Sequence, residues 1–185
     1  NFKCCRVYLQ MNTGLYLKRI NYDGDITPGL DTLTKLQQAH LMTVPFENLD
    51  IHNKVEIGIS NSYNKIVIQK RGGFCYELNS AFYQLLQSLG YTVRIISARV
   101  YNKEIGFGPE FDHMAILTTI DQQEFLTDVG FGEFSLRPLK VQLNQDLSDP
   151  RGVFRMEKYD EAYIVVKRMS AEGVFVPEYI FSDQT

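Results

Sequence analysis

The spacing of the hydrophobic residues changes at Gly90, and no other feature of the sequence constrains the fold as strongly. Before Gly90, apolar side chains recur every three or four residues, as on one face of a helix: Leu78, Ala81, Phe82, Leu85, Leu86 and Leu89. After Gly90, segments such as 92–101 are rich in β-branched and aromatic residues, which is typical of strands. Helices followed by strands indicate an α+β fold and not a βαβ alternation.

Helical patterns fill most of the first half of the chain. One pattern covers residues 12–20, and a second is expected to be capped by Asp31 or Thr32 and to end before Pro45. Segment 62–70 fits either a helix or an extended piece. Gly90 suits the C-terminal end of the helix that precedes it.

The second half is predicted to be antiparallel strands with short connections. Residues 102–109 contain two glycines and a proline and are expected to form a loop. The predicted strands share β-branched and aromatic composition, and they cover residues 92–101, 113–120, 124–129, 155–158, 162–168 and 173–182.

Composition and charge exclude several classes of function. The chain has 185 residues, of which 44% are hydrophobic and 22% charged, and this is typical of one large or two small soluble domains. A net charge of −3 gives no electrostatic reason to expect a nucleic-acid or anionic-membrane partner. No apolar run approaches the length of a membrane-spanning helix, and residues 1–11 lack the apolar core of a signal peptide.

The cysteines indicate a reducing compartment. There are three, Cys4, Cys5 and Cys75, and an odd number with two adjacent members does not suit a disulfide framework. We therefore expect a cytoplasmic protein. The sequence has no CxxC pair and no HExxH motif, so no metal site is predicted.

Residues 71–79, with the sequence RGGFCYELN, form the strongest candidate site. The glycine turn places Cys75 at the start of a helix, where unpaired N–H groups favour a negative charge and hence the thiolate. A thiolate is the nucleophilic form of cysteine. The alternative interpretation is a buried structural cysteine.

A cysteine nucleophile needs a base, and three histidines are available. His40 lies on an apolar helical face and is expected to be a core or cap residue. His52 lies in a polar segment and is expected to be solvated. His113 begins a strand after a glycine-containing loop, so it can lie at the rim of a sheet and is the best candidate.

Strand pairing then selects a carboxylate to orient His113. If Asp121 and Gln122 form the centre of a hairpin, opposite residues have numbers that sum to 243, and His113 faces Gly130. Asp128 is then its diagonal neighbour on the same face, roughly 7–8 Å away between Cβ atoms. A register slip of one residue would turn Asp128 to the other face. The remaining carboxylates point away or lie at the far end of the hairpin: Asp112, Asp121 and Glu124.

Glu47 and Arg71 are predicted to support the glycine turn. Glu47 lies in the segment PFENLD, whose acidic and apolar residues indicate a structural role. Because an arginine beside a buried turn needs a partner, we expect Glu47 to pair with Arg71.

Four segments of the chain resemble the arylamine N-acetyltransferase family. They are VPFENLD (44–50), RGGFCYELN (71–79), FDHMAIL (111–117) and TDVGFG (127–132), in the order and spacing of that family. The resemblance extends from about Asn12 to the end of the chain. It implies a helical domain over residues 12–90 and a β-barrel domain over residues 91–185, which together resemble the core of papain-like cysteine enzymes. Residues 1–11 form an extension outside the pattern.

The resemblance also implies roles for particular residues. Cys75 matches the acetyl-accepting nucleophile, His113 the general base and Asp128 the carboxylate that orients the base. Phe46, Phe131 and Gly132 match positions around the acceptor pocket. The implied donor is acetyl-CoA, and the implied acceptors are small aromatic amines, hydrazines and hydroxylamines. A Cys–His–Asp set at a helix start suits a ping-pong transfer through an acetyl thioester on Cys75.

Members of the family usually continue into a third α/β lid domain, so we expect that domain to be missing from a chain that ends at Thr185. Such a form is expected to bind CoA weakly and to lose acetyl groups to water. Two other interpretations stay open. One is an amide hydrolase of the papain or transglutaminase type with the same three residues, and the other is a catalytically silent truncated form.

Overall fold

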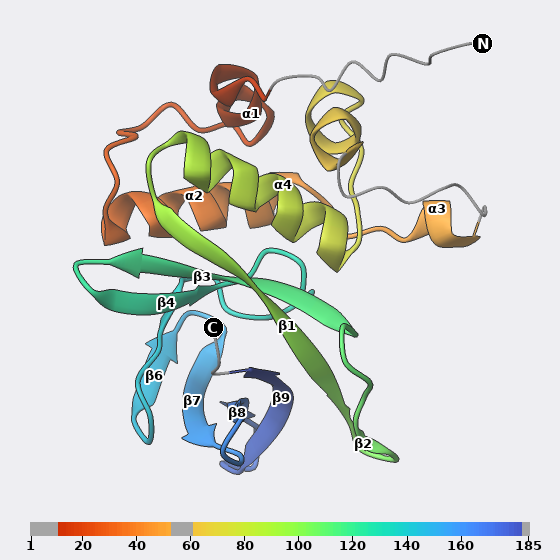
Figure 1. Cartoon of the computed structure of the whole chain (residues 1–185), viewed down its shortest axis with the longest axis vertical. Helices are drawn as coiled ribbons and strands as arrows, with labels where there is room; N and C mark the ends of the chain where they lie inside the picture. The colour runs from red at the N-terminus through yellow and green to blue at the C-terminus, as the bar shows by residue number, and fades with distance from the viewer. Residues whose placement is uncertain (1–10, 53–60, 183–185) are drawn as a thin grey trace.

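The computed structural model describes residues 11–52 and 61–182, and these form two stacked layers (Figure 1). Helices from the first half lie at the top of the view. The strands of the second half form an antiparallel sheet below them, which curves into a nearly closed barrel. The predicted α+β arrangement is confirmed. The division of the chain into domains stays a prediction, and residues 1–10 of the expected extension lie outside the described residues.

The helical layer begins with α1 (Thr13–Arg19) and α2 (Leu30–Thr43), and it continues with the short helix α3 (Leu49–His52), the π-helix η2 (Asn64–Ile68) and α4 (Cys75–Ser88). Asn12 caps α1 through a hydrogen bond from the Leu15 N–H. Gly90 follows α4 with a φ of 92°, a left-handed conformation that suits glycine at a helix end.

The predicted cap of α2 is wrong. The helix begins earlier than expected, at Leu30, and Gly29 precedes it without a side-chain cap. Asp31 instead pairs with Lys35 one turn later, at 2.6 Å, and Thr32 is buried. Both candidate cap residues therefore lie inside the helix.

Within the described residues the sheet has nine strands, with β1 and β9 as the neighbours that join its two halves. The strand order is β5-β4-β3-β1-β9-β8-β7-β6, and β2 pairs with β1. Their bounds are β1 (Thr92–Asn102), β2 (Gly106–Phe107), β3 (His113–Ile120), β4 (Gln123–Thr127), β5 (Leu139–Lys140), β6 (Asp146–Asp149), β7 (Gly152–Lys158), β8 (Tyr163–Met169) and β9 (Phe175–Ser182).

The hairpin between β3 and β4 has the predicted register. Ile116 faces Thr127 and Ile120 faces Gln123, so the residue numbers of opposite pairs sum to 243. The turn consists of Asp121 and Gln122, both with positive φ, as in the two-residue turns that match the twist of a hairpin. This register brings the segment after β4 beside the start of β3.

Three strands and one helix were not predicted from the sequence. β2 and β5 have only two residues each, and β6 has the polar sequence DLSD, so none shows the pattern of a buried strand. The helix α3 has four residues within the PFENLD segment and its flank. The pairing of the three strands depends on neighbouring strands and not on local sequence preference.

Two hydrophobic clusters fill the layers, and β3 separates them. Ile116 belongs to the cluster of the helical layer, whereas Ala115 and Leu117 belong to the cluster inside the barrel. Helix α4 packs on β1 and β3. The start of α4 therefore lies next to the rim of the barrel, where β3 begins.

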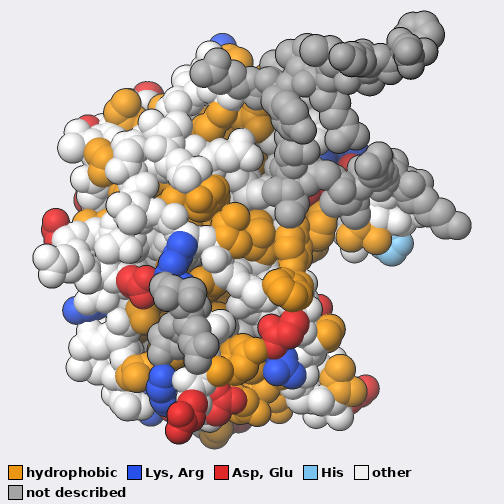
Figure 2. Space-filling view, in the orientation of Figure 1, with side chains coloured by type: hydrophobic (Ala, Val, Ile, Leu, Met, Phe, Trp, Pro, Cys, Tyr) orange, Lys and Arg blue, Asp and Glu red, His pale blue; other side chains and the backbone are white. Residues whose placement is uncertain are grey.

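Hydrophobic side chains form a band across the middle of one face of the molecule, at the level where the two layers meet (Figure 2). In the described ranges, no helix combines the length and the hydropathy that a bilayer crossing requires.

Candidate active site

Cys75 is the first residue of α4, as predicted, and its side chain is half-buried. Phe74 precedes it in an extended conformation. The first turn of a helix has N–H groups without intrahelical partners, so the backbone around Cys75 presents donors to an anion.

The glycine turn before Cys75 is paired with the segment after α2. The Glu47 N–H donates to the Gly73 carbonyl oxygen at 2.9 Å, and the Gly73 N–H donates to the Pro45 carbonyl oxygen at 3.3 Å. A Cβ atom on Gly72 would lie 2.1 Å from the Pro45 carbonyl oxygen. Only glycine allows these two backbones to approach so closely.

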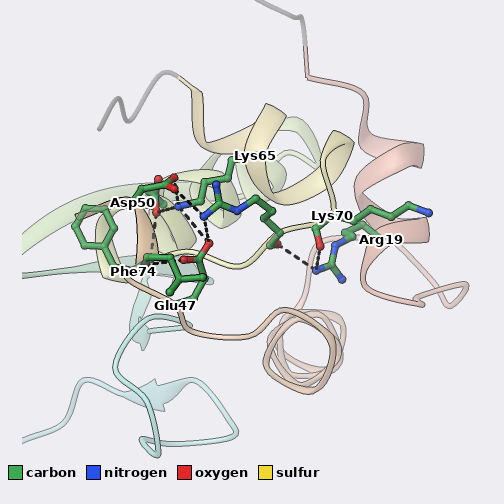
Figure 3. A network of polar contacts seen from close by, with 9 residues as sticks. Arg19, Glu47, Asp50, Lys65, Lys70 and Phe74 are labelled. Atoms are coloured by element: carbon green, nitrogen blue, oxygen red, sulfur yellow. Dashed lines mark hydrogen bonds and ion pairs between the residues drawn. The ribbon is translucent and has the colours of Figure 1, made fainter. Parts of the chain in front are cut away.

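A network of ion pairs also stabilises the glycine turn (Figure 3). The predicted pair is present, since Arg71 Nη2 lies 2.7 Å from Glu47 Oε1. Arg71 also contacts Asp50 at 2.7 Å. Lys65 Nζ, which the sequence did not single out, lies 2.8 Å from Asp50, 2.7 Å from Glu77 and 3.4 Å from Glu47.

The network connects to the helix that carries Cys75. Glu77 is two residues after Cys75, and its Oε2 accepts both the Lys65 ammonium and the Phe74 N–H. Burial acts against ionisation of Glu47, but the Leu49 N–H, Lys65 and Arg71 together lower its pKa. The segments 45–50, 65–71 and 73–77 are thus tied together by charged side chains.

His113, the first residue of β3, lies beside Asp128. Its Nε2 atom is 2.7 Å from Asp128 Oδ2, and both side chains are buried. The His113 ring also packs against Phe131 and Tyr179, at centroid distances of 4.9 and 5.4 Å. Because Nε2 faces Asp128, Nδ1 is the nitrogen left for Cys75.

Asp128 is held by four hydrogen bonds. Its Oδ1 atom accepts from Asn79 Nδ2 at 2.9 Å and from the Gly130 N–H at 2.9 Å. Its Oδ2 atom accepts from His113 and from the Tyr179 hydroxyl, the latter at 3.2 Å. A carboxylate with all its acceptor positions occupied is fixed in orientation.

The surroundings of His113 favour its protonated form. Burial opposes protonation, but the charge and hydrogen bond of Asp128, followed by the contact with Cys75, raise the pKa of His113 to about 10. His113 is therefore an imidazolium at neutral pH, placed between a carboxylate and a thiol.

A pocket of about 280 Å³ opens at this position. Its lining includes two residues of the predicted catalytic set, Cys75 and His113, and all three predicted acceptor-site residues. The complete lining consists of Phe46, Cys75, Val100, Asp112, His113, Gly130, Phe131 and Gly132. A Cβ atom on Gly130 would lie 2.7 Å from the Cys75 Cα atom. The loop after β4 therefore touches the backbone of the cysteine, and glycine is required at that contact.

The other two histidines lie elsewhere. His40 is buried within α2, where the Tyr16 hydroxyl lies 3.0 Å from its Nδ1 atom. Burial, and to a smaller degree the charge of Arg19, lowers the pKa of His40 to about 3. His52 is exposed in α3. Both positions agree with the roles expected from the sequence.

Sequence reasoning missed the buried polar residues that surround the predicted set. Asn79 donates to Asp128 and to the Met114 carbonyl oxygen and accepts from the Val129 N–H, so it joins α4 to β3 and to the loop after β4. Its position four residues after Cys75, on the same helical face, was the one available signal. Tyr179 gave no signal, because β9 reaches the site only through the pairing of distant strands.

Among residues 11–52 and 61–182, no group of three or more His, Cys, Asp or Glu side chains is arranged to hold a metal ion.

Comparison with known proteins shows which sequences and structures this chain resembles. A family model described as N-acetyltransferase matches residues 29–185. The arylamine N-acetyltransferase pineal gland isozyme NAT-3 of Gallus gallus is 34% identical over 158 residues, and the arylamine N-acetyltransferase of Escherichia coli K12 is 33% identical over 153 residues. These alignments cover 82% and 81% of this chain. The chain spans about half, 54%, of the length of each relative.

Solved structures show the same fold. The arylamine N-acetyltransferase of M. tuberculosis superposes with a TM-score of 0.86 at 31% identity, covering 94% of this chain and 67% of the other. The Mycobacterium marinum enzyme in complex with CoA has a TM-score of 0.86 at 30% identity, covering 94% and 66%. The chain belongs to the arylamine N-acetyltransferase family.

Proposed function

We propose that this protein transfers an acetyl group from acetyl-CoA to an arylamine or arylhydrazine through a thioester on Cys75. The observation that carries the proposal is the buried His113–Asp128 pair, 2.7 Å apart, next to a cysteine at the first residue of a helix. The three side chains come from α4, β3 and the loop after β4. Such a set is the arrangement that activates a cysteine for acyl transfer.

In the first half of the reaction, Cys75 attacks the thioester carbonyl of acetyl-CoA. Cysteine attacks as its thiolate, and the His113 imidazolium supplies the counter-charge. A bond forms between Cys75 Sγ and the carbonyl carbon, and the bond from that carbon to the CoA sulfur breaks. The Cys75 backbone N–H, at the N-terminus of α4, is a candidate donor to the oxyanion. His113 gives its proton to the departing CoA sulfur.

In the second half, the neutral amino group of the acceptor attacks the acetyl carbon. A bond forms between nitrogen and carbon, and the bond from carbon to Cys75 Sγ breaks. His113, now neutral, takes the proton from the nitrogen and becomes an imidazolium again. The thiolate and the imidazolium are thereby restored for the next cycle.

The lining of the pocket supports an aromatic acceptor. Phe46 and Phe131 supply aromatic surface next to Cys75, and this suits a flat apolar ring. The related M. marinum enzyme, solved in complex with CoA, supports acetyl-CoA as the donor. Relatives at 33–34% identity are named arylamine N-acetyltransferases.

The proposal is tested by intact-protein mass spectrometry after incubation with acetyl-CoA. We expect a gain of one acetyl group, located on Cys75, that disappears when an arylamine such as 4-methylaniline is added. Cys75→Ala should gain nothing and serves as the control. The same samples are assayed for the N-acetylated amine, which should appear in equal amount.

Two results would contradict the proposal. Amine release from peptides or glutamine without any acetyl adduct would support the amide hydrolase instead. No adduct, together with iodoacetamide labelling of Cys75 at the rate of an ordinary thiol, would support a catalytically silent form. Loss of the adduct to water in the absence of amine would show that the acetyl thioester is poorly shielded.

A further inference from the structure

A carboxylate lines the pocket and has no role in the transfer chemistry proposed above. Besides Cys75 and His113, which take part in that chemistry, Asp112 is the ionisable side chain among the described residues that line the pocket. Asp112 is exposed, whereas His113 is buried and paired with Asp128. The sequence predicted that Asp112 points away from His113 on a strand, but β3 begins at His113 and both residues line the pocket.

The backbone around Asp112 holds it in place. Phe111, the preceding residue, has a φ of 62°, and its N–H donates to Ser97 Oγ at 3.0 Å. Its carbonyl oxygen accepts the Tyr76 hydroxyl, which comes from the first turn of α4. The position of Asp112 is therefore tied to the helix that carries Cys75 and to β1.

The carboxylate lies against the backbone of Gly108. A Cβ atom on Gly108 would lie 2.5 Å from Asp112 Oδ2, so glycine at this position leaves the space that the carboxylate occupies. Burial, followed by the charges of Cys75 and Asp112, raises the pKa of Tyr76. The charges of Asp112 and Cys75 thus both raise the pKa of the Tyr76 hydroxyl, as expected for two residues that line one pocket.

Nearby cations are engaged with other groups. Arg99 donates from Nε to the Gly108 carbonyl oxygen at 2.7 Å, and its Nη1 lies 3.8 Å from Glu110. Arg151 donates to the carbonyl oxygens of Gly132 and Phe134. Within residues 11–52 and 61–182, the structure shows no ion pair of Asp112, so its charge is left for a ligand.

A carboxylate next to aromatic rings is the chemistry that recognises an ammonium group. Phe46 and Phe131 line the same pocket as Asp112, and a cation is attracted both by the faces of such rings and by the carboxylate. In the acetylated enzyme Cys75 carries no charge, and His113 is neutral because it has given its proton to CoA. Asp112 is then the charged side chain among the described residues that line the pocket.

We propose that Asp112 makes the acceptor site selective for arylamines that carry a positively charged substituent on the ring. The inference rests on the proposed function, because it names the acceptors of the same pocket. The reacting amino group remains neutral and lies at Cys75, while the cationic substituent lies at the mouth of the pocket beside Asp112.

The preference is expected to be moderate because Asp112 is exposed. Two opposite charges about 4–6 Å apart near a protein surface attract each other enough to change a rate constant by roughly 5- to 10-fold. The preference should weaken as salt is raised from about 0.01 M to 1 M, because the screening length falls from roughly 30 Å to 3 Å.

The experiment measures the second half of the reaction with acceptors of one shape and different charge. Cys75 is first acetylated with 4-nitrophenyl acetate, which needs no CoA site, and the adduct is verified by mass. Discharge is then followed with (4-aminobenzyl)trimethylammonium, with its uncharged carbon isostere 4-neopentylaniline, and with the anion 4-aminobenzoate. The quaternary ammonium cannot itself be acetylated, so the product is unambiguous.

Asp112→Asn removes the charge and keeps the shape. We expect the ratio of the cation rate to the isostere rate to fall roughly 5- to 10-fold in this variant. The rate for the anion should rise, and the rate for the isostere should stay within about twofold. Ratios between the wild type and the variant cancel differences in the intrinsic reactivity of the amines.

Asp121→Asn is the matched control. It removes the same charge at the turn end of β3, opposite the end where His113 lies, and asparagine tolerates the positive φ of 49° there. This variant should leave the ratio of the cation rate to the isostere rate unchanged. Gly108→Ala keeps the charge of Asp112 but displaces its carboxylate, and it should also lower the ratio.

Each remaining outcome has one meaning. If Asp112→Asn slows all three acceptors equally, Asp112 moves a proton or holds the loop, and the selectivity proposal is wrong. A wild-type preference for the isostere or the anion also overturns it. If Cys75 is never acetylated, the proposed function fails instead, and this result is distinguished by mass before any acceptor is added.

Discussion

Two carboxylates near His113 differ in their surroundings, and this difference separates their roles. Asp128 is buried and accepts four hydrogen bonds, whereas Asp112 is exposed at the pocket. A buried carboxylate with fixed donors suits the proposed role of orienting the imidazole, and an exposed carboxylate suits the proposed contact with a ligand. Asp112 precedes β3 and Asp128 follows β4, so the two residues flank one hairpin.

Asp128→Asn tests the first of these roles. An amide has one oxygen and must place an N–H group where Asp128 now accepts from donors, so at least one donor of the set loses its partner. We expect the free energy of unfolding to fall by roughly 1–3 kcal/mol and acetyl transfer to fall by about 10²–10⁴-fold. The pKa of His113 should fall, as followed by NMR of its ring nitrogens.

Asp31→Asn controls for the loss of a carboxylate. Asp31 is exposed in α2, and among the contacts of the described chain it pairs only with Lys35. We therefore expect Asp31→Asn to change the free energy of unfolding by less than about 0.5 kcal/mol. If Asp128→Asn kept the imidazolium of His113 at pH 8, the carboxylate would not be the cause of the raised pKa.

At the scale of elements, the glycine turn depends on η2. The π-helix places Lys65 toward segments 45–50 and 73–77, and Lys65 there meets three carboxylates (Figure 3). Single turns of π-helix are rare and frequently lie at functional sites. The wide turn aims a long cationic side chain at the start of the helix that carries Cys75.

Lys65→Met tests the contribution of this network. Methionine keeps most of the side-chain volume but leaves Glu77 buried without its cation, and breaking a buried pair in this way costs about 3–5 kcal/mol. We expect urea unfolding to show this decrease in the free energy of unfolding. Iodoacetamide labelling of Cys75 should also change, because Glu77 holds the Phe74 N–H beside it.

Lys35→Met is the matched control, since Lys35 forms one exposed ion pair with Asp31. It should change stability by less than about 0.5 kcal/mol and leave the labelling of Cys75 as it is. Equal effects of the two substitutions would show that the network is no stronger than a surface pair.

At the scale of the whole molecule, each layer contains one buried histidine, and their pKa values shift in opposite directions. The pKa of His40, in the helical core, is lowered to about 3 by burial and by Arg19. In the barrel, the pKa of His113 is raised to about 10, because Asp128 and Cys75 outweigh burial. The two histidines therefore make the free energy of unfolding depend on pH in different pH ranges.

The sign follows from which state binds the proton. The unfolded chain protonates His40 below about 6.5 and the folded chain does not, so its stabilising effect is complete above 6.5 and is lost as pH falls toward 3. His113 behaves oppositely, and its contribution is lost as pH rises from 6.5 to about 10.

We predict that the free energy of unfolding falls by up to about 1.4 kcal/mol per pH unit between about pH 6 and 4.5 because of His40. Urea unfolding of the wild type and of His40→Asn isolates this effect, because asparagine keeps an acceptor near the Tyr16 hydroxyl and does not titrate. The variant should show a shallower fall over this range. Parallel curves for the two proteins would refute the assignment to His40.

Several features of the site followed from local sequence. The turn of Asp121 and Gln122 accounts for the register of β3 and β4, and this register is what puts Asp128 beside His113. The glycine turn and the helical spacing after it placed Cys75 at the start of α4. The predicted cap of α2 failed, because the helix begins at Leu30; inside it, Asp31 pairs with Lys35 and Thr32 is buried.

By itself, the sequence determined that helices precede strands, that Cys75 lies at the start of a helix and how one hairpin is paired. These depend on periodicity and turn chemistry over a few residues, where the chain's own geometry limits the possibilities. Only the tertiary structure decided that Lys65 meets the carboxylates around the glycine turn, that Tyr179 contacts Asp128 and that Asp112 lines the pocket. Tyr179 lies 51 residues from the Asp128 that it contacts, and such contacts depend on how the layers pack. The local spacing of side chains gives no information about contacts between residues that are so far apart in the sequence.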